Sequence, residues 1–283
     1  MSIRTDLAVE SINPQAAKLE GITQNVRDGV GCDITEVIVE TDQAGEQIGK
    51  GKGKYLTIET DRLSAHPDEF EGMVDCIAAE IVKLAPQSGD VMVIGLGNND
   101  ITPDALGPKV ISQVLATRHL SQELPEGHEL SGLRSISAIA PGVLGQTGIE
   151  VAEIAKAICD KTKPAVVVVI DALACSDIKR LGCTIQLTDT GISPGSGVQN
   201  SRKELSKRSL GSPVIAIGVP TVVDMHTIVQ SITGKEVDKS LPNMMVTPRD
   251  IDKLIERTAK LVAFSINKAF LPDMSIEDFT ALA

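Results

Sequence analysis

The sequence predicts an α/β protein of three layers, with helices on both faces of a mainly parallel, mixed β-sheet. Two observations lead to this fold class. From residue 91 onward, short apolar runs alternate with longer stretches of helical pattern. The most apolar of these runs contain no polar positions, which is typical of strands buried on both faces. Before residue 91 the chain is more polar, and we expect this part to add a β-containing elaboration.

The N-terminal part contains two predicted strands, 35–40 and 54–59, separated by the glycine- and lysine-rich run 49–53. That run could also hold a phosphate, but it lacks the Walker spacing and a following helix, so a turn is favoured. Residues 68–84 are predicted to form an amphipathic helix. Its apolar face consists of Phe70, Val74, Ile77, Ile81 and Leu84.

The α/β core should contain four strands and four helices. The predicted strands are 91–94, 135–140, 165–170 and 214–217, and the predicted helices are 106–118, 147–160, 221–232 and a last helix that reaches about Phe270. In the last helix, Thr247 is the expected N-cap and Pro248 lies in the first turn. Residues 182–212 interrupt the alternation with an extended run, 183–187, and a loop rich in Gly, Ser and Pro. We expect one domain with residues 90–283 as its α/β core.

The composition excludes several classes of function. The 283 residues carry a net charge of −11, and only 2% are aromatic, with no Trp and one Tyr. Stacking on bases or sugars needs exposed aromatic faces, and an acidic chain repels phosphate backbones, so no direct nucleic-acid partner is expected. No apolar run approaches the roughly 20 residues that span a bilayer, and the first residues lack the apolar core of a signal peptide. We therefore expect a cytoplasmic protein without a membrane partner.

The cysteines and histidines do not form a recognisable metal motif. The five cysteines are scattered without a Cys-x-x-Cys pair, which predicts neither a structural zinc site nor a disulfide framework. The four histidines are equally dispersed and lack the His-Glu-x-x-His pattern. Reduced, mostly buried cysteines are the expected state.

The candidate site follows from the loops after the predicted strands. In open α/β sheets, ligands bind beyond the carboxyl ends of the strands. The loops there are 95–108, 141–148, 171–174 and 218–224, and three of them contain acidic residues. Their glycines and prolines allow close approach of backbone to a ligand.

Asp171 and Asp104 are the strongest candidates in these loops. Asp171 ends a run of six apolar residues, so its carboxylate should be partly desolvated, and Asp104 should lie across the crevice near a helix start. Each also has a structural interpretation: Asp104 as an N-cap and Asp171 as a loop anchor. Together they could be an acid/base pair that shares a proton, or metal ligands completed by a distant residue such as His226. Spacing alone does not separate these uses.

Other motifs are weaker. Gly95-Leu96-Gly97 resembles the start of a dinucleotide fingerprint, but Asp100 stands where the third glycine belongs. The serines of 191–197 lack a strand–turn–helix elbow and a nearby histidine, so a wall loop is favoured over a nucleophile. The basic residues Arg202, Lys203, Lys207 and Arg208 are usually a solvated helix face, but in this acidic chain they could bind an acidic substrate.

Several blocks of the sequence carry a family resemblance. They are 4–10, 95–98 with 102–108, 141–143 with 146–150, 170–174, 195–198 with 202–204, and 213–224. These blocks closely resemble the germination proteases of spore-forming Gram-positive bacteria, nearly from end to end. The sequence departs from longer members after Thr233, where a short link leads to Met245. This shortening removes no candidate catalytic residue.

The resemblance implies an endopeptidase that degrades small acid-soluble spore proteins in the spore core during germination. It also implies an inactive homotetrameric zymogen that removes its own N-terminal segment. Family substrates are cut after an acidic residue and before a hydrophobic residue followed by Ala. Residues 5–10, TDLAVE, have this form, which predicts self-cleavage between Asp6 and Leu7, with 1–6 as propeptide and 7–283 as peptidase domain. Removal of Arg4 and Asp6 takes away one charge of each sign, so release of a blocking segment or a loop rearrangement should activate the enzyme.

The family is also similar in fold to hydrogenase-maturation endopeptidases, in which a matching acidic pair binds a metal. In germination proteases the resemblance implies an aspartic-type dyad, and Asp104 and Asp171 occupy those positions. A peptidase without metal or other cofactor is therefore the leading hypothesis. A metallopeptidase with the same carboxylates and a non-catalytic spore-protein or nucleotide-binding module remain alternatives. Gly97, Asn98, Arg202, Lys203 and Arg208 are the expected substrate contacts.

Overall fold

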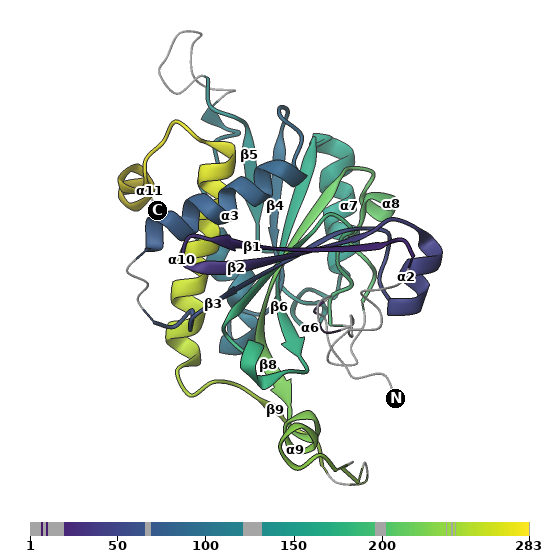
Figure 1. Ribbon diagram of the computed structural model, residues 1–283. Helices are drawn as coiled ribbons and strands as arrows, with labels where there is room; N and C mark the ends of the chain where they lie inside the picture. Colours follow the sequence, from purple (N-terminus) through teal and green to yellow (C-terminus); the bar gives the residue numbers. More distant parts are fainter. Residues whose placement is uncertain are drawn as a thin grey trace.

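A single β-sheet organises the molecule (Figure 1). A computed structural model describes residues 7, 10, 20–65, 69–120, 132–195, 202–235, 237, 238, 240 and 242–282. Within these residues, nine strands form one sheet in the order β1-β2-β3-β7-β8-β6-β4-β5, with β9 paired to β8. The strands are β1 (Ile22–Gly29), β2 (Cys32–Val39), β3 (Gly53–Thr60), β4 (Val91–Gly95), β5 (Ile136–Ile139), β6 (Val166–Cys175), β7 (Thr184–Thr188), β8 (Val214–Asp224) and β9 (Met245–Val246).

The sheet is mixed, as predicted, and its two halves differ in strand direction. β5, β4, β6 and β8 run parallel, whereas β7, β3, β2 and β1 pair in antiparallel fashion beyond β8. The N-terminal elaboration is thus part of the same sheet, joined to the α/β core where β3 pairs with β7. The antiparallel half is larger than the sequence indicates, because the pairing of β3 with β7 links residues more than a hundred positions apart.

Helices cover both faces of the sheet, which confirms the three-layer α/β fold (Figure 1). On one face lie α3 (Phe70–Leu84), α4 (Leu106–Ile111), α10 (Ile251–Phe270) and α11 (Ile276–Leu282), and on the other lie α7 (Val151–Thr162) and α8 (Lys207–Leu210). The shorter elements are α2 (Asp42–Ile48), α6 (Leu144–Thr147), α9 (Met225–Thr233) and the 3₁₀ turns η2 (Thr102–Asp104) and η3 (Ile178–Arg180). In the described part of the chain, no helix combines the length and apolar character that crossing a membrane requires.

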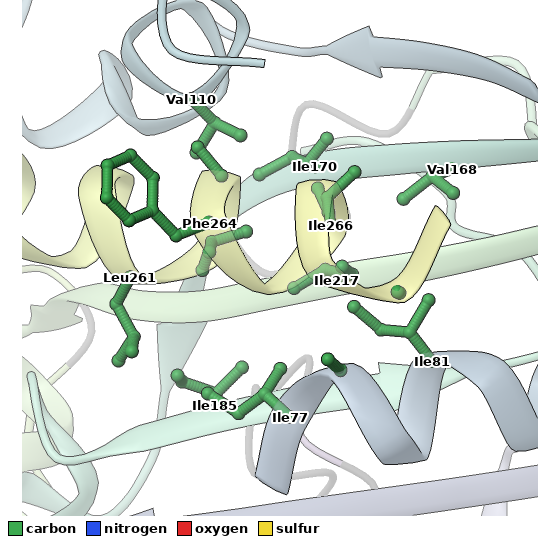
Figure 2. Close-up of a cluster of buried hydrophobic side chains, with 14 of the residues drawn as sticks. Ile77, Ile81, Val110, Val168, Ile170, Ile185, Ile217, Leu261, Phe264 and Ile266 are labelled. Atoms are coloured by element: carbon green, nitrogen blue, oxygen red, sulfur yellow. The ribbon is translucent and has the colours of Figure 1, made fainter. Parts of the chain in front are cut away.

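The largest core lies between α10, α3 and the sheet (Figure 2). Phe264 of α10 is fully buried and meets Phe70 and Phe279 edge to face, with ring centroids 6.2 and 5.7 Å apart. Alternate residues of β6 point to this core, and the residues between them point to the smaller core under α7. The almost uninterrupted apolar sequence of β6 follows from this double burial.

Four predicted boundaries are wrong for identifiable reasons. β6 and β8 continue past residues 170 and 217, because they keep pairing with each other as far as Cys175 and Val223. The helix expected from residue 221 therefore begins only at Met225, where Asp224 accepts a hydrogen bond from Thr227 N at 3.0 Å. The last helix begins at Ile251, and Thr247 is not its N-cap, because the Thr247 hydroxyl donates to Pro248 O instead.

Two further helices differ from the prediction. The helix expected over 106–118 ends at Ile111. The link between β2 and β3 contains α2, which was not predicted. Thr41 caps this helix by accepting a hydrogen bond from Ala44 N at 3.2 Å. Gly49 ends α2 in the left-handed conformation, so the glycine- and lysine-rich run begins as a helix terminus and leads into β3.

Candidate active site

Asp171 lies inside β6, at the point where the neighbouring strand β4 stops. The last register pair between the two strands joins Gly95 to Ile170. On the other side β8 continues, and Gly218 is the register partner of Asp171. Asp171 is therefore the first β6 residue that borders the space beyond β4, and it is only 6% exposed.

The loop that leaves β4 carries Asp104 back to this space. Leu96 N donates to Ile170 O at 2.8 Å, which continues the contact with β6 past the end of β4. Gly97 follows with φ of +112°, and a Cβ there would lie 1.9 Å from the Asp104 carbonyl oxygen and 3.2 Å from its Oδ1. Only glycine permits this approach. Asp104 thus contacts Gly97, and Gly97 directly follows Leu96, the residue that is hydrogen-bonded to Ile170 of β6.

Contacts to Asp104 and to the turn that carries it hold the side chain in place. Asn98 N donates to its Oδ2 at 2.8 Å. Its own 3₁₀ turn, η2, contacts β6 and β8, and Thr221 of β8 donates its hydroxyl to Pro103 O at 2.8 Å. The alternative that Asp104 is the N-cap of α4 is wrong, because Ala105 holds that position and no side chain caps it.

Both carboxyl groups are largely shielded from solvent. Desolvation raises the pKa of Asp104 above its ordinary value, and the hydrogen bond from Asn98 N offsets part of that rise. Asp171 is also buried and accepts from Ala172 N at 3.0 Å through Oδ1. The structure thus places one half-buried and one buried carboxyl group on elements that contact each other, η2 and β6.

Asn98 and Gln146 close the outer side of the loop. Gln146 of α6 donates its Nε2 to Asn98 Oδ1 at 2.9 Å and to Asp100 Oδ2 at 3.2 Å. Asn98 Oδ1 also accepts from Asp100 N at 3.0 Å. Asn98 therefore contributes its backbone N–H to Asp104, while its side chain ties the loop to α6. Sequence reasoning did not select Gln146, although its place in the loop after a core strand was a usable signal.

A cavity opens beside Asp171 on the α7 face of the sheet. Its volume is about 370 Å³, and its lining includes Gly218, Leu173, Gln186, Tyr55 and Lys50. Gly218 is the register partner of Asp171 and Leu173 follows Asp171 on β6, so the cavity is lined by neighbours of Asp171 on the sheet. Two larger cavities, of about 720 and 840 Å³, lie elsewhere, and neither aspartate is among the lining residues of any of the three cavities.

The basic residues that were predicted to contact substrate each face a carboxylate. Arg202 Nη1 lies 3.9 Å from Glu150 Oε1, and Lys203 Nζ lies 2.8 Å from Glu153 Oε1. Arg208 Nη2 lies 3.1 Å from Glu204 Oε2. The hydrogen bond from Lys203 to Glu153 raises the pKa of that lysine. These pairs are largely solvent-exposed, so each contributes little to stability.

The predicted cleavage point is only partly within the described residues. Asp6 and the propeptide 1–6 lie outside them, but Leu7 is described and is fully buried. It belongs to an apolar cluster with Leu173, Cys175 and Val223, two of which follow Asp171 on β6.

The donor set of a metal site is incomplete in the described part of the chain. No three His, Cys, Asp or Glu side chains are grouped there as potential ligands. In particular, His226 does not join Asp104 and Asp171 in such a group.

Comparisons with known proteins agree with the motifs. A family model described as germination protease matches residues 3–235. The germination protease of Clostridium tetani is 38% identical over 322 aligned positions, which cover 99% of each chain. That of Caldanaerobacter subterraneus subsp. tengcongensis is 39% identical and covers 100% of this chain and 98% of the relative. That of Geobacillus sp. is 45% identical over 84% of this chain and 67% of the relative.

Among solved structures, the chain is similar to the NiFe hydrogenase maturation protease HycI of Thermococcus kodakarensis. The TM-score is 0.37 and the identity 17%, over 66% of this chain and 99% of the other. The full-length sequence matches and the family model carry the assignment. The chain belongs to the germination protease family.

Proposed function

We propose that this chain is the endopeptidase that starts the degradation of small acid-soluble spore proteins during germination, in the spore core, with Asp104 and Asp171 as its catalytic pair. Membership of the germination protease family supports the activity. The observation that carries the assignment of residues is that the loop after β4 and the η2 turn, which carries Asp104, both contact β6, the strand that carries Asp171.

Asp104 is the partner that holds the proton in this proposal. Its raised pKa supports that role, because a carboxyl group that keeps its proton can donate a hydrogen bond to the scissile carbonyl oxygen. Asp171, ionised, takes a proton from a water molecule as that water attacks the carbonyl carbon, while Asp104 protonates the carbonyl oxygen. In the collapse of the resulting diol, Asp171 returns its proton to the leaving nitrogen and Asp104 recovers one from a hydroxyl. The net reaction consumes one water and leaves both carboxyl groups as they began.

The chain is also its own first substrate in this proposal. Residues 5–10 contain an acidic residue, then Leu7 and Ala8, so cleavage between Asp6 and Leu7 would release residues 1–6. The same preference, for a cut after Asp or Glu and before a hydrophobic residue followed by Ala, would apply to spore proteins. Assembly as a homotetrameric zymogen is expected from the family resemblance, and sedimentation of the purified chain measures it.

The test compares Asp104→Asn and Asp171→Asn with Asp160→Asn, a control on the exposed side of α7 whose side chain is 61% accessible. Self-processing is followed by mass spectrometry, and cleavage of a purified acid-soluble spore protein is followed on a gel. Both site variants should lose at least about 100-fold in rate, as expected for a general acid or base, and the control should not. Normal processing by either site variant would refute the assignment. Chelator-sensitive activity that a divalent ion restores would select a metallopeptidase, and intact spore protein in every sample would select a binding module.

A further inference from the structure

The residue that follows the predicted cleavage point is buried beside the candidate catalytic strand. Leu7 is 0% exposed and packs with Leu173 and Cys175 of β6 and Val223 of β8. We call this apolar cluster the Leu7 seat. Leu173 and Cys175 alternate with Asp171 along β6, so all three side chains point to the same face of the sheet.

The next described residue of this segment, Glu10, is held by a second set of contacts. Its Oε2 accepts from Ser176 N at 2.8 Å and from Ser176 Oγ at 2.6 Å, and its Oε1 accepts from Asp177 N at 3.0 Å. Arg180 Nε lies 3.8 Å from Oε1. We call these groups the Glu10 cradle. The Glu10 side chain is only 4% exposed, so its charge is buried and compensated on several sides.

Along the chain, the Leu7 seat comes first after Asp171 and the Glu10 cradle comes second. Leu7 and Glu10 come in the same order after the predicted scissile bond. Leu7 meets residues two and four positions beyond Asp171, and Glu10 meets residues five and six positions beyond it. A strand rises about 3.3 Å per residue, so the Leu7 seat begins about 7 Å from Asp171. The direction from Leu7 to Glu10 therefore leads away from Asp171. A substrate bound in the same direction would present the bond before its first seated residue toward Asp171.

We propose that the Leu7 seat and the Glu10 cradle are the substrate subsites for the residues on the carboxyl side of the scissile bond. The first of these residues is a bulky aliphatic side chain, and the fourth is a carboxylate. This inference rests on the proposed function and extends it to the residues that select the substrate. The chain's own N-terminal segment occupies both subsites for self-cleavage, and a spore protein with the same two features occupies them in trans.

The chemistry of the Glu10 cradle favours selection over simple anchoring. A buried carboxylate is an expensive anchor, because its desolvation must be offset by every donor around it. This arrangement also makes the site selective, because a ligand without the carboxylate would leave buried N–H and O–H donors without hydrogen bonds, at a cost in binding free energy. Arg180 also bonds Glu59 at 2.6 Å, so it stays oriented and partly neutralised when no ligand is bound.

Two peptides test the inference in trans. Each carries an acidic residue, the cut bond and Leu-Ala-Val, and the fourth residue after the bond is Glu in one and Gln in the other. The self-processed enzyme should cleave the Glu peptide with a kcat/KM about 10- to 100-fold higher, because the amide loses charge-assisted hydrogen bonds. The enzyme's own N-terminal segment competes equally with both peptides, so it does not affect the ratio of their kcat/KM values.

Enzyme variants then show whether the Glu10 cradle itself reads that residue. Ser176→Ala and Arg180→Gln should each reduce the ratio of kcat/KM for the Glu peptide to kcat/KM for the Gln peptide, because each variant removes a donor that only the carboxylate uses fully. In the full chain, Glu10→Gln should slow self-processing by a similar factor, and Glu20→Gln, an exposed control, should not. Two variants of the Glu10 cradle are used so that the test still holds if one of them does not fold.

The outcomes separate the two proposals. Equal cleavage of both peptides by the wild-type enzyme, or equal losses on both peptides in both cradle variants, would overturn the subsites and leave the peptidase standing. If the Asp171→Asn control cleaves the peptides as fast as the wild type, the proposed catalytic pair fails first and the subsites lose their basis.

Discussion

Gly97 offers a sharp test of how the site is built. Gly97→Ala would place a methyl group 1.9 Å from the Asp104 carbonyl oxygen, where contacts under 3.0 Å essentially never occur. The η2 turn must therefore move by about 1 Å, and a displacement of that size can lower a rate by about 100-fold. Alanine at a φ of +112° is also strained, by roughly 1–3 kcal/mol.

The assay pairs two measurements on two variants. Self-processing by mass spectrometry should slow by about 100-fold in Gly97→Ala. Its melting temperature should fall by only about 2–10 °C, which the backbone strain accounts for in a chain of this size. Gly145→Ala is the matched control, because it lies in nearby α6, has no neighbour within 4 Å of an added Cβ and has an unstrained backbone. Wild-type processing by Gly97→Ala would refute the claim that the close approach of Gly97 to Asp104 sets the catalytic geometry.

Three further predictions concern charge and burial. Burial raises the pKa of Asp104 above 3.8, so the native protein loses stability as the pH rises through the pKa of the folded state. Asn at this position does not titrate, so the melting temperature of Asp104→Asn minus that of the wild type should increase from acidic to neutral pH. A difference that stays constant with pH would contradict this. Burial raises the pKa of Cys175 to about 12, so alkylation of this thiol at neutral pH should be slow in the full chain. Leu7→Asp should increase the alkylation rate, because Leu7 packs against Cys175. Equal rates in the two proteins would show that Leu7 does not cover the thiol. Glu80 is buried and bonds Arg27 at 2.6 Å and Lys83 at 2.8 Å, so Glu80→Gln should cost about 1–3 kcal/mol in urea unfolding without slowing processing.

The strands of the core could be predicted because β4, β6 and β8 are buried on both faces and leave an almost purely apolar sequence. The ends of β6 and β8 could not be predicted. Asp171 interrupts the apolar run, yet the strand continues, because its pairing with β8 extends to Cys175. That pairing is a long-range property and leaves no local pattern.

The two aspartates could be selected from sequence, but their supports could not. The 3₁₀ turn that carries Asp104 and the bond from Asn98 N depend on the φ of Gly97 and on packing against β8. Likewise, Arg202 and Lys203 look like free basic residues in the sequence, whereas the first turn of α7 and its N-cap place Glu153 and Glu150 beside them. The roles of Leu7 and Glu10 needed the structure, since their contacts lie more than 160 positions away.

A double-mutant cycle on self-processing tests the central claim most directly. The claim is that Asp104 and Asp171 act as one unit on one water molecule. Groups that act as a unit are strongly non-additive, so the double variant Asp104→Asn/Asp171→Asn should process no more than a few-fold slower than the slower single variant. Losses that multiply across the two substitutions, or a single variant that matures at the wild-type rate, would contradict it.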